Sequence, residues 1–95
     1  MSNITIDELI PMIGKVNIID IRNAQSYNNQ HITGAINIPF EKLIISPSKY
    51  LEVNKKYFIY CRSGMTSKKA CQILSNYGFK VVNIIGGYEE WILKK

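Results

Sequence analysis

The sequence lacks the features that mark membrane, secreted and zinc-binding proteins. No apolar run exceeds five residues, whereas a membrane-spanning helix needs roughly 20. The N-terminus has no basic segment of the kind that opens a signal peptide. The two cysteines, Cys61 and Cys71, form no C-x-x-C pair, so neither a disulfide framework nor a zinc site is indicated. We therefore expect a cytoplasmic protein with reduced thiols, no membrane contact, no metal and no cofactor.

Acidic residues are fewer than basic ones, at 7 against 12, which leaves a net charge of +5. No basic run exceeds two residues, whereas nucleic-acid binders usually cluster basic side chains on one element. We expect no nucleic-acid partner, and a positive field that attracts a small anion or an acidic protein. Lys68 and Lys69 are the one suggestive cluster: they form either a solvated helix face or a docking point for an acidic carrier.

Internal repeats and low-complexity tracts are absent from the 95 residues, which are enough for one domain spanning residues 1–95. Short apolar runs alternate with helix-like stretches. Strands are predicted over residues 3–4, 16–21, 35–38, 56–60 and 80–85. Helices are predicted over residues 5–15, 24–30, 40–45, 66–77 and 88–95, with a turn at 48–51.

Local signals refine two of these helices. Thr5 followed by Glu8 is typical of a capping box, and Pro11 predicts a kink or an early end, since proline removes a backbone hydrogen bond. The helix over 66–77 is predicted to bury one face, because apolar residues recur in it at helical spacing, namely Ala70, Ile73, Leu74 and Tyr77. Gly78 predicts its end.

Several predicted strands are apolar on both faces, which favours a parallel sheet covered by helices on two sides. Ligands of such sheets bind at the carboxyl ends of the strands. Cys61 lies at one of these ends, directly after the strand over 56–60.

The six-residue loop from Cys61 to Thr66 is suited to sulfur chemistry. With its amide N–H groups turned inward it forms an anion-binding concavity, and the helix that follows adds the partial positive charge of its N-terminus. Both features, together with Arg62, favour a thiolate, which is the nucleophilic form. The alternative is that Cys61 is a small apolar residue that ends a strand.

Four motifs together carry a resemblance that extends over roughly residues 4–93. They are Asp20-Ile21-Arg22 followed by Tyr27, the segment from His31 to Pro39, the loop from Cys61, and Gly86-Gly87-Tyr88 with Trp91. In order and spacing the chain is similar to the single-domain rhodanese sulfurtransferases.

The resemblance implies an α/β fold: a five-stranded parallel sheet in the order 1-5-4-2-3, flanked by helices on both faces. It also implies catalysis through a persulfide on Cys61, loaded by an anionic sulfur donor such as thiosulfate. The acceptor would be cyanide, a thiol or a protein. The loop residues would bind the substrate, namely Arg62, Ser63, Gly64, Met65 and Thr66.

The chain departs from the family pattern at Gln30, where glycine is usual, and at Thr66, where many members have arginine. Ser67 stands where a related phosphatase loop has its arginine, which disfavours a phosphatase-like or arsenate-handling enzyme. A further alternative is a non-catalytic docking or redox-sensor module on the same fold.

Other residues carry alternative roles. Asp20 and Arg22 either support the loop as a strand-end pair or touch the substrate. His31 is interpreted as ordering the turn into the third strand, since an ionised thiolate needs no general base. Cys71 either packs in the core or resolves an oxidised Cys61.

Overall fold

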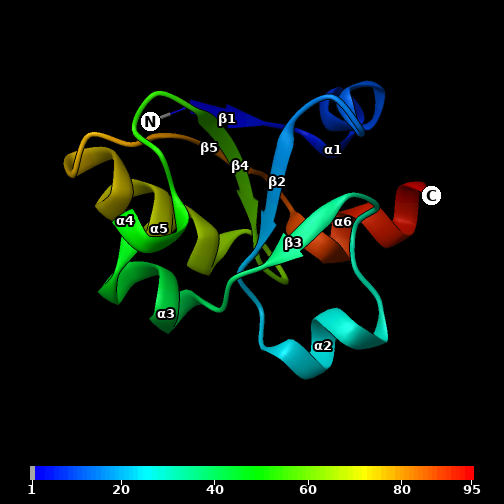
Figure 1. Ribbon diagram of the computed structural model, residues 1–95. Coiled ribbons are helices and arrows are strands. Elements are labelled where there is room, and N and C mark those ends of the chain that lie inside the picture. Colours follow the sequence, from blue (N-terminus) through cyan, green and yellow to red (C-terminus); the bar gives the residue numbers. More distant parts are fainter. Residues whose placement is uncertain (1) are drawn as a thin grey trace.

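The computed structural model describes residues 2–95 and contains one five-stranded parallel sheet (Figure 1). The strand order is β1-β5-β4-β2-β3, so the predicted topology is confirmed. The strands are β1 (Ser2–Ile4), β2 (Asn17–Asp20), β3 (Ala35–Asn37), β4 (Lys56–Tyr60) and β5 (Lys80–Ile84).

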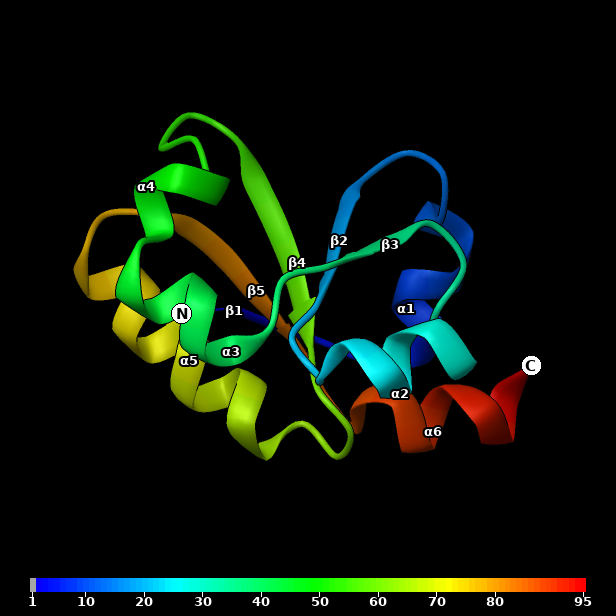
Figure 2. The same cartoon turned by 60° about the horizontal axis from the view of Figure 1, so that its bottom comes forward.

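Helices cover both faces of this sheet (Figures 1 and 2). One face carries α1 (Ile6–Leu9), α2 (Ala24–Asn29) and α6 (Gly87–Lys94). The other carries α3 (Phe40–Ile45), α4 (Pro47–Tyr50) and α5 (Met65–Asn76). No helix within residues 2–95 has the length and apolarity that crossing a bilayer requires.

Alternate residues of the central strands enter two separate cores, because successive side chains of a strand point to opposite faces. On β4, Tyr57 and Ile59 pack under α3 and α5, whereas Phe58 and Tyr60 pack under α1 and α6. All four side chains are buried. Burial on both faces explains why β4 is an apolar run without a polar alternation.

The first helix is as short as its proline predicts. The Glu8 side chain accepts from the Thr5 N–H at 2.8 Å and the Glu8 N–H donates to the Thr5 hydroxyl at 3.2 Å, which confirms the capping box. α1 ends at Leu9, and a 3₁₀ turn over Ile10–Met12 contains Pro11.

Some predicted boundaries are wrong by one or more residues. α5 begins at Met65 rather than 66, because Gly64 adopts φ +99° and caps the helix through its backbone. α6 likewise begins at Gly87, after Gly86 at φ +81°. β2 is shorter than predicted, since residue 16 and residue 21 lie outside its ladder.

The register of the sheet brings distant polar residues to one edge. Asp20 at the end of β2 pairs with Tyr60 of β4 and with Asn37 of β3. On the other side of β4, Ile59 pairs with Asn83 of β5. Cys61 follows Tyr60, so it lies at the carboxyl edge between these strands.

Candidate active site

The Cys61 sulfur lies at the centre of the loop between β4 and α5. Cys61 is only 6% exposed. The backbone N–H groups of Gly64 and Ser67 donate to Sγ at 3.2 and 3.3 Å. Sγ thus lies where two backbone donors converge, at the start of a 12-residue helix whose N-terminus favours negative charge.

These contacts lower the pKa of Cys61 below its usual range. Burial acts first and in the opposite direction, since it disfavours the charged thiolate and raises the pKa. The hydrogen bond between Cys61 and the Ser67 side chain, together with those from the N–H groups of Ser67, Gly64 and Ser63, outweighs burial. The site therefore favours the thiolate more than water does.

The inward direction of the loop N–H groups depends on α6. Tyr88 donates its N–H to the Cys61 carbonyl at 2.9 Å, and Glu89 donates its N–H to the Arg62 carbonyl at 2.9 Å. The first N–H groups of a helix have no partner within the helix, so here they bind the outward carbonyls of the loop. Figure 2 shows the loop after β4 beside the start of α6.

Cys61 opens into a pocket of about 420 Å³ that α2, α6 and the loop enclose. Two arginines line it together with Cys61, and its lining residues are Ile21, Arg22, Asn23, Ser26, Cys61, Arg62, Thr66 and Tyr88. Of the loop residues predicted to bind substrate, Arg62 and Thr66 therefore reach the pocket of the sulfur.

The other three predicted binding residues line a second hollow. Ser63, Gly64 and Met65 face this hollow with Lys68. Met65 is 74% exposed and does not line the pocket of Cys61. The six-residue loop thus divides its residues between two hollows, and both Gly64 and Ser63 also interact with Cys61 through their backbone N–H groups.

Arg62 extends from the rim of the pocket into solvent. Its side chain is 79% exposed and its Nε lies 3.6 Å from Oε2 of Glu89. An exposed ion pair of this length contributes little stability, so the guanidinium is free to turn toward an anion in the pocket.

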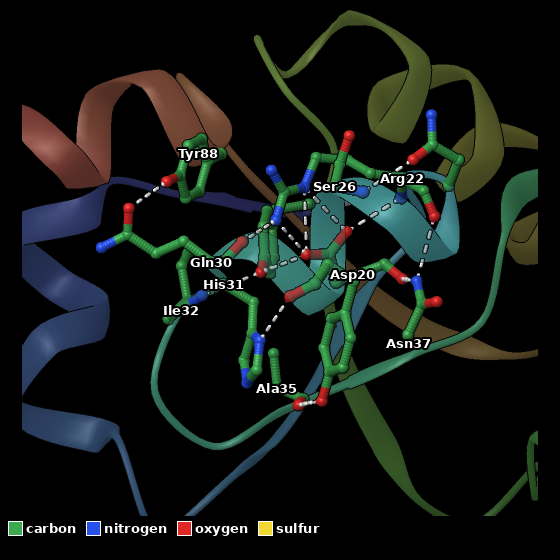
Figure 3. Close-up of polar contacts among 12 residues, drawn as sticks. Asp20, Arg22, Ser26, Gln30, His31, Ile32, Ala35, Asn37 and Tyr88 are labelled. Carbon is green, nitrogen blue, oxygen red and sulfur yellow. Dashed lines mark hydrogen bonds and ion pairs between the residues drawn. The ribbon is translucent and has the colours of Figure 1, made fainter.

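Asp20 is the centre of a buried polar network beside the pocket (Figure 3). Its side chain is fully buried and accepts from Nε and Nη2 of Arg22 and, at 2.6 Å, from the Tyr60 hydroxyl. Burial and the Asp20 carboxylate both raise the pKa of Tyr60, so this hydroxyl stays protonated and donates. Asp20 thus fixes the position of Arg22, which lines the pocket.

Arg22 links this network to the pocket. Its Nη2 donates to the Gln30 carbonyl at 2.6 Å, and its guanidinium carbon lies 4.1 Å from the centre of the Tyr88 ring. The Tyr88 hydroxyl in turn donates to Oε1 of Gln30 (Figure 3). Arg22 is therefore both a partner of Asp20 and a lining residue of the pocket.

His31 lies outside the pocket, on the turn that leads to β3. Its Nδ1 is 2.8 Å from the Tyr27 carbonyl and its ring stacks on the Tyr27 ring at 3.8 Å. The Tyr27 hydroxyl donates to the Ala35 carbonyl at 2.6 Å. These contacts agree with the interpretation that His31 orders this turn.

Cys71 is completely buried in the core beneath α5. Burial raises the pKa of Cys71 to about 12, with a small contribution from Cys61. These observations favour packing over a redox role.

The two thiols should therefore react differently with iodoacetamide. We expect alkylation of Cys61 to rise with pH to a plateau, with a midpoint below that of a free cysteine, because only the thiolate reacts. Cys71 should stay unmodified while the protein is folded. Peptide mass spectrometry across a pH series measures both, and equal labelling of the two cysteines would contradict this assignment.

Sequence reasoning missed the roles of Ser67, Asn83 and Tyr88. Ser67 lies three residues before Ala70, so the helical spacing that predicts the buried face of α5 also places Ser67 on it. Asn83 is a polar residue in the buried part of β5, and this departure from the apolar pattern indicates a role beyond packing. Nothing local to Tyr88 indicates that it lines the pocket.

Comparison with known proteins gives a consistent result. A family model described as Rhodanese-like domain matches residues 5–94. The thiosulfate sulfurtransferase GlpE of Coxiella burnetii is 36% identical over 75 residues, which cover 78% of this chain and 69% of that protein. GlpE of Shewanella oneidensis is 32% identical over 92 residues, with 94% and 90% covered. YrkF of Bacillus subtilis, named as a sulfur carrier, is 32% identical over 77 residues; these cover 80% of this chain and only 41% of YrkF.

Solved structures agree with the sequence relatives. A rhodanese-related protein of Thermoplasma volcanium has a TM-score of 0.89 at 31% identity, with 99% of this chain and 93% of that chain covered. A protein of Staphylococcus saprophyticus has a TM-score of 0.87 at 35% identity, with 96% and 93% covered.

Proposed function

The chain belongs to the rhodanese-like domain family, and on this premise we propose that it is a sulfurtransferase that carries sulfane sulfur as a persulfide on Cys61. The observation that supports this most directly is the environment of Cys61: its sulfur accepts hydrogen bonds from two backbone N–H groups, and the residue lines a pocket together with two arginines. The proteins named thiosulfate sulfurtransferase among its relatives agree with this activity.

In the first half-reaction, the Cys61 thiolate attacks the outer sulfur of thiosulfate. The bond between the two thiosulfate sulfurs breaks, and sulfite leaves with the electron pair. The new S–S bond leaves Cys61 as a persulfide whose outer sulfur carries the negative charge. Covalent catalysis of this kind divides one transfer into two easier steps.

The two arginines offset the repulsion between the thiosulfate dianion and the Cys61 thiolate. Arg22 is held rigidly by Asp20 at the inner wall of the pocket, whereas Arg62 is exposed at the rim. Charge-assisted hydrogen bonds from guanidinium groups to oxyanions are strong and directional. We assign Arg62 to capture of the donor and Arg22 to the shape and charge of the wall.

In the second half-reaction, an acceptor attacks the outer sulfur and the Cys61 thiolate leaves. Cyanide would give thiocyanate, and a thiol or a protein cysteine would become a persulfide. Because Arg62 and Thr66 are exposed at the mouth, a bulky acceptor can approach.

Phosphate-ester hydrolysis is disfavoured by Ser67. A phosphatase loop needs an arginine to clamp the phosphoryl group, yet Ser67 is buried and hydrogen-bonded inside the protein. Turnover of an aryl phosphate by the purified protein would reopen this alternative.

Sulfur loading tests the proposal directly. The reduced protein is incubated with thiosulfate, and the intact mass and the Cys61 peptide are recorded, with Cys61→Ser as the control. We expect one added sulfur atom on Cys61 that cyanide removes. If Cys61 stays unmodified with thiosulfate and with other sulfane donors, the catalytic proposal fails and the docking or sensor module replaces it.

A further inference from the structure

Two buried polar side chains, those of Ser67 and Asn83, lie next to the Cys61 sulfur, and packing alone does not require them. The Cys61 Sγ is 3.5 Å from the Ser67 Oγ, and the Ser67 hydroxyl donates to Oδ1 of Asn83 at 2.6 Å. Ser67 is fully buried and Asn83 is 3% exposed. Burying an amide and a hydroxyl costs free energy that an apolar pair would not, so a role beyond packing is indicated.

The Ser67 hydroxyl lies next to both Cys61 and Asn83 but has only one proton to donate. A serine hydroxyl has one proton, and here Ser67 gives it to Asn83, so its oxygen accepts the S–H of Cys61. This arrangement suits a neutral thiol. Once the thiol ionises, a further donor would stabilise the sulfur beside the N–H groups of Gly64 and Ser67, whereas an oxygen lone pair aimed at it would repel the charge.

Asn83 allows the hydroxyl to change partner. An amide offers both an acceptor oxygen and a donor nitrogen, so a half-turn of the Asn83 side chain presents Nδ2 to the Ser67 oxygen. The Ser67 hydroxyl can then turn and donate to the thiolate. A serine inside a helix usually bonds to the carbonyl of its own preceding turn, whereas Ser67 bonds across to β5.

We propose that Ser67 and Asn83 form a positioning pair, which directs the one hydroxyl proton to Asn83 while Cys61 is a thiol and to the sulfur when Cys61 is charged. This inference rests on the proposed function for its role in sulfur transfer. Cys61 is charged twice in that cycle, first as the attacking thiolate and again as the leaving thiolate of the second half-reaction. In the loaded state the charge moves to the outer sulfur, and the Ser67 proton returns to Asn83.

The pair should therefore affect the two half-reactions differently with pH. Without the Ser67 donor, loading slows at neutral pH because less thiolate is present, and it recovers at high pH where Cys61 is ionised in either variant. Discharge depends on how well the thiolate leaves, and a thiol of higher pKa leaves more slowly. Raising the pH therefore does not restore the rate of discharge.

The test titrates Cys61 in a Cys71→Ala background, so that one thiol alone responds. We expect Ser67→Ala to raise the midpoint of thiolate formation, followed by ultraviolet absorbance and by alkylation rate, by about one pKa unit. Ser75→Ala, on the same helix and away from the sulfur, should leave the midpoint unchanged. These measurements use no sulfur donor, so they remain informative if the proposed function fails.

A double-mutant cycle tests whether Asn83 acts through Ser67. Asn83→Val should shift the midpoint in the parent and leave it unchanged once Ser67 is alanine. Equal effects of Asn83→Val in both backgrounds would overturn the pair, as would a Ser67→Ala midpoint equal to that of the parent. Alanine favours a helix, so Ser67→Ala is expected to fold.

Stopped-flow measurement of each half-reaction separates the inference from the proposed function. We expect Ser67→Ala to load like the parent at high pH and still to discharge to cyanide several-fold more slowly. Equal recovery of loading and discharge would contradict the leaving-group role. A parent protein that titrates as expected but never loads sulfur would instead refute the proposed function and keep the pair as a thiol-tuning device.

Discussion

Cys61→Ser is expected to reduce thiosulfate:cyanide sulfur transfer by a factor on the order of 10³ or more, to the background of the uncatalysed reaction. A serine hydroxyl is not ionised at neutral pH and does not form a persulfide, so both half-reactions lose their carrier. The measurement is thiocyanate formation at steady state. Serine is nearly the size of cysteine, and its oxygen can accept the N–H groups of Gly64 and Ser67, so the fold should be retained although position 61 is buried.

Cys71→Ala provides the matched control for this result. Cys71 is buried, and burial raises its pKa to about 12, so it should contribute nothing to turnover. We expect normal activity with a somewhat lower free energy of unfolding, measured by urea denaturation. Residual transfer in Cys61→Ser that disappears when Cys71 is also removed would show that the assignment of the nucleophile is wrong.

Gly87→Ala should disable the site without altering any group that reacts. Gly87 adopts φ +56°, and a Cβ there would collide with the carbonyl oxygen of Cys61 and lie 3.0 Å from that of Arg62. These are backbone atoms, so the loop must shift. Since a displacement near 1 Å costs about 10²-fold in rate, we expect a loss on the order of 10²-fold in sulfur loading and about 1–3 kcal/mol in unfolding free energy.

Gly78→Ala isolates the contribution of backbone strain. Gly78 also has a positive φ, at +92°, but nothing lies within 4 Å of the position where its Cβ would be. This variant should lose about 1 kcal/mol of stability and keep its loading rate. If Gly87→Ala loads sulfur as fast as Gly78→Ala, the contact between α6 and the loop does not shape the site.

Local sequence signals were sufficient for most of the fold. Proline, glycine and capping residues act on their immediate neighbours. Thr5 and Glu8 therefore predicted the capped start of α1 correctly, and Pro11 predicted its early end. The apolar run before Cys61 predicted β4 to the residue, since burial on both faces leaves no polar position after Lys56. Boundaries at Gly64 and Gly86 were missed because glycine caps through its backbone conformation and leaves no side-chain signal.

The site was predictable only in part. The position of Cys61 follows from a strand that runs into a helix, which is a sequential relation. The division of the loop residues between two hollows is not a sequential relation, because Arg62 lines one hollow and Ser63 and Met65 line the other. Substrate binding by all three stays a prediction. The bond from Ser67 to Asn83 joins positions 16 residues apart, and no periodicity links them.

The sequence by itself determined the order of strands and helices, the place of the cysteine among them and the charge around it, because propensity, periodicity and capping act within a few residues. Only the tertiary structure decided which way the loop turns its N–H groups. That orientation depends on the N–H groups of Tyr88 and Glu89, which bind the carbonyls of Cys61 and Arg62 across 27 residues of chain. A hydrogen bond between distant segments exists only once packing has brought them together, and the chemistry of the sulfur depends on that contact.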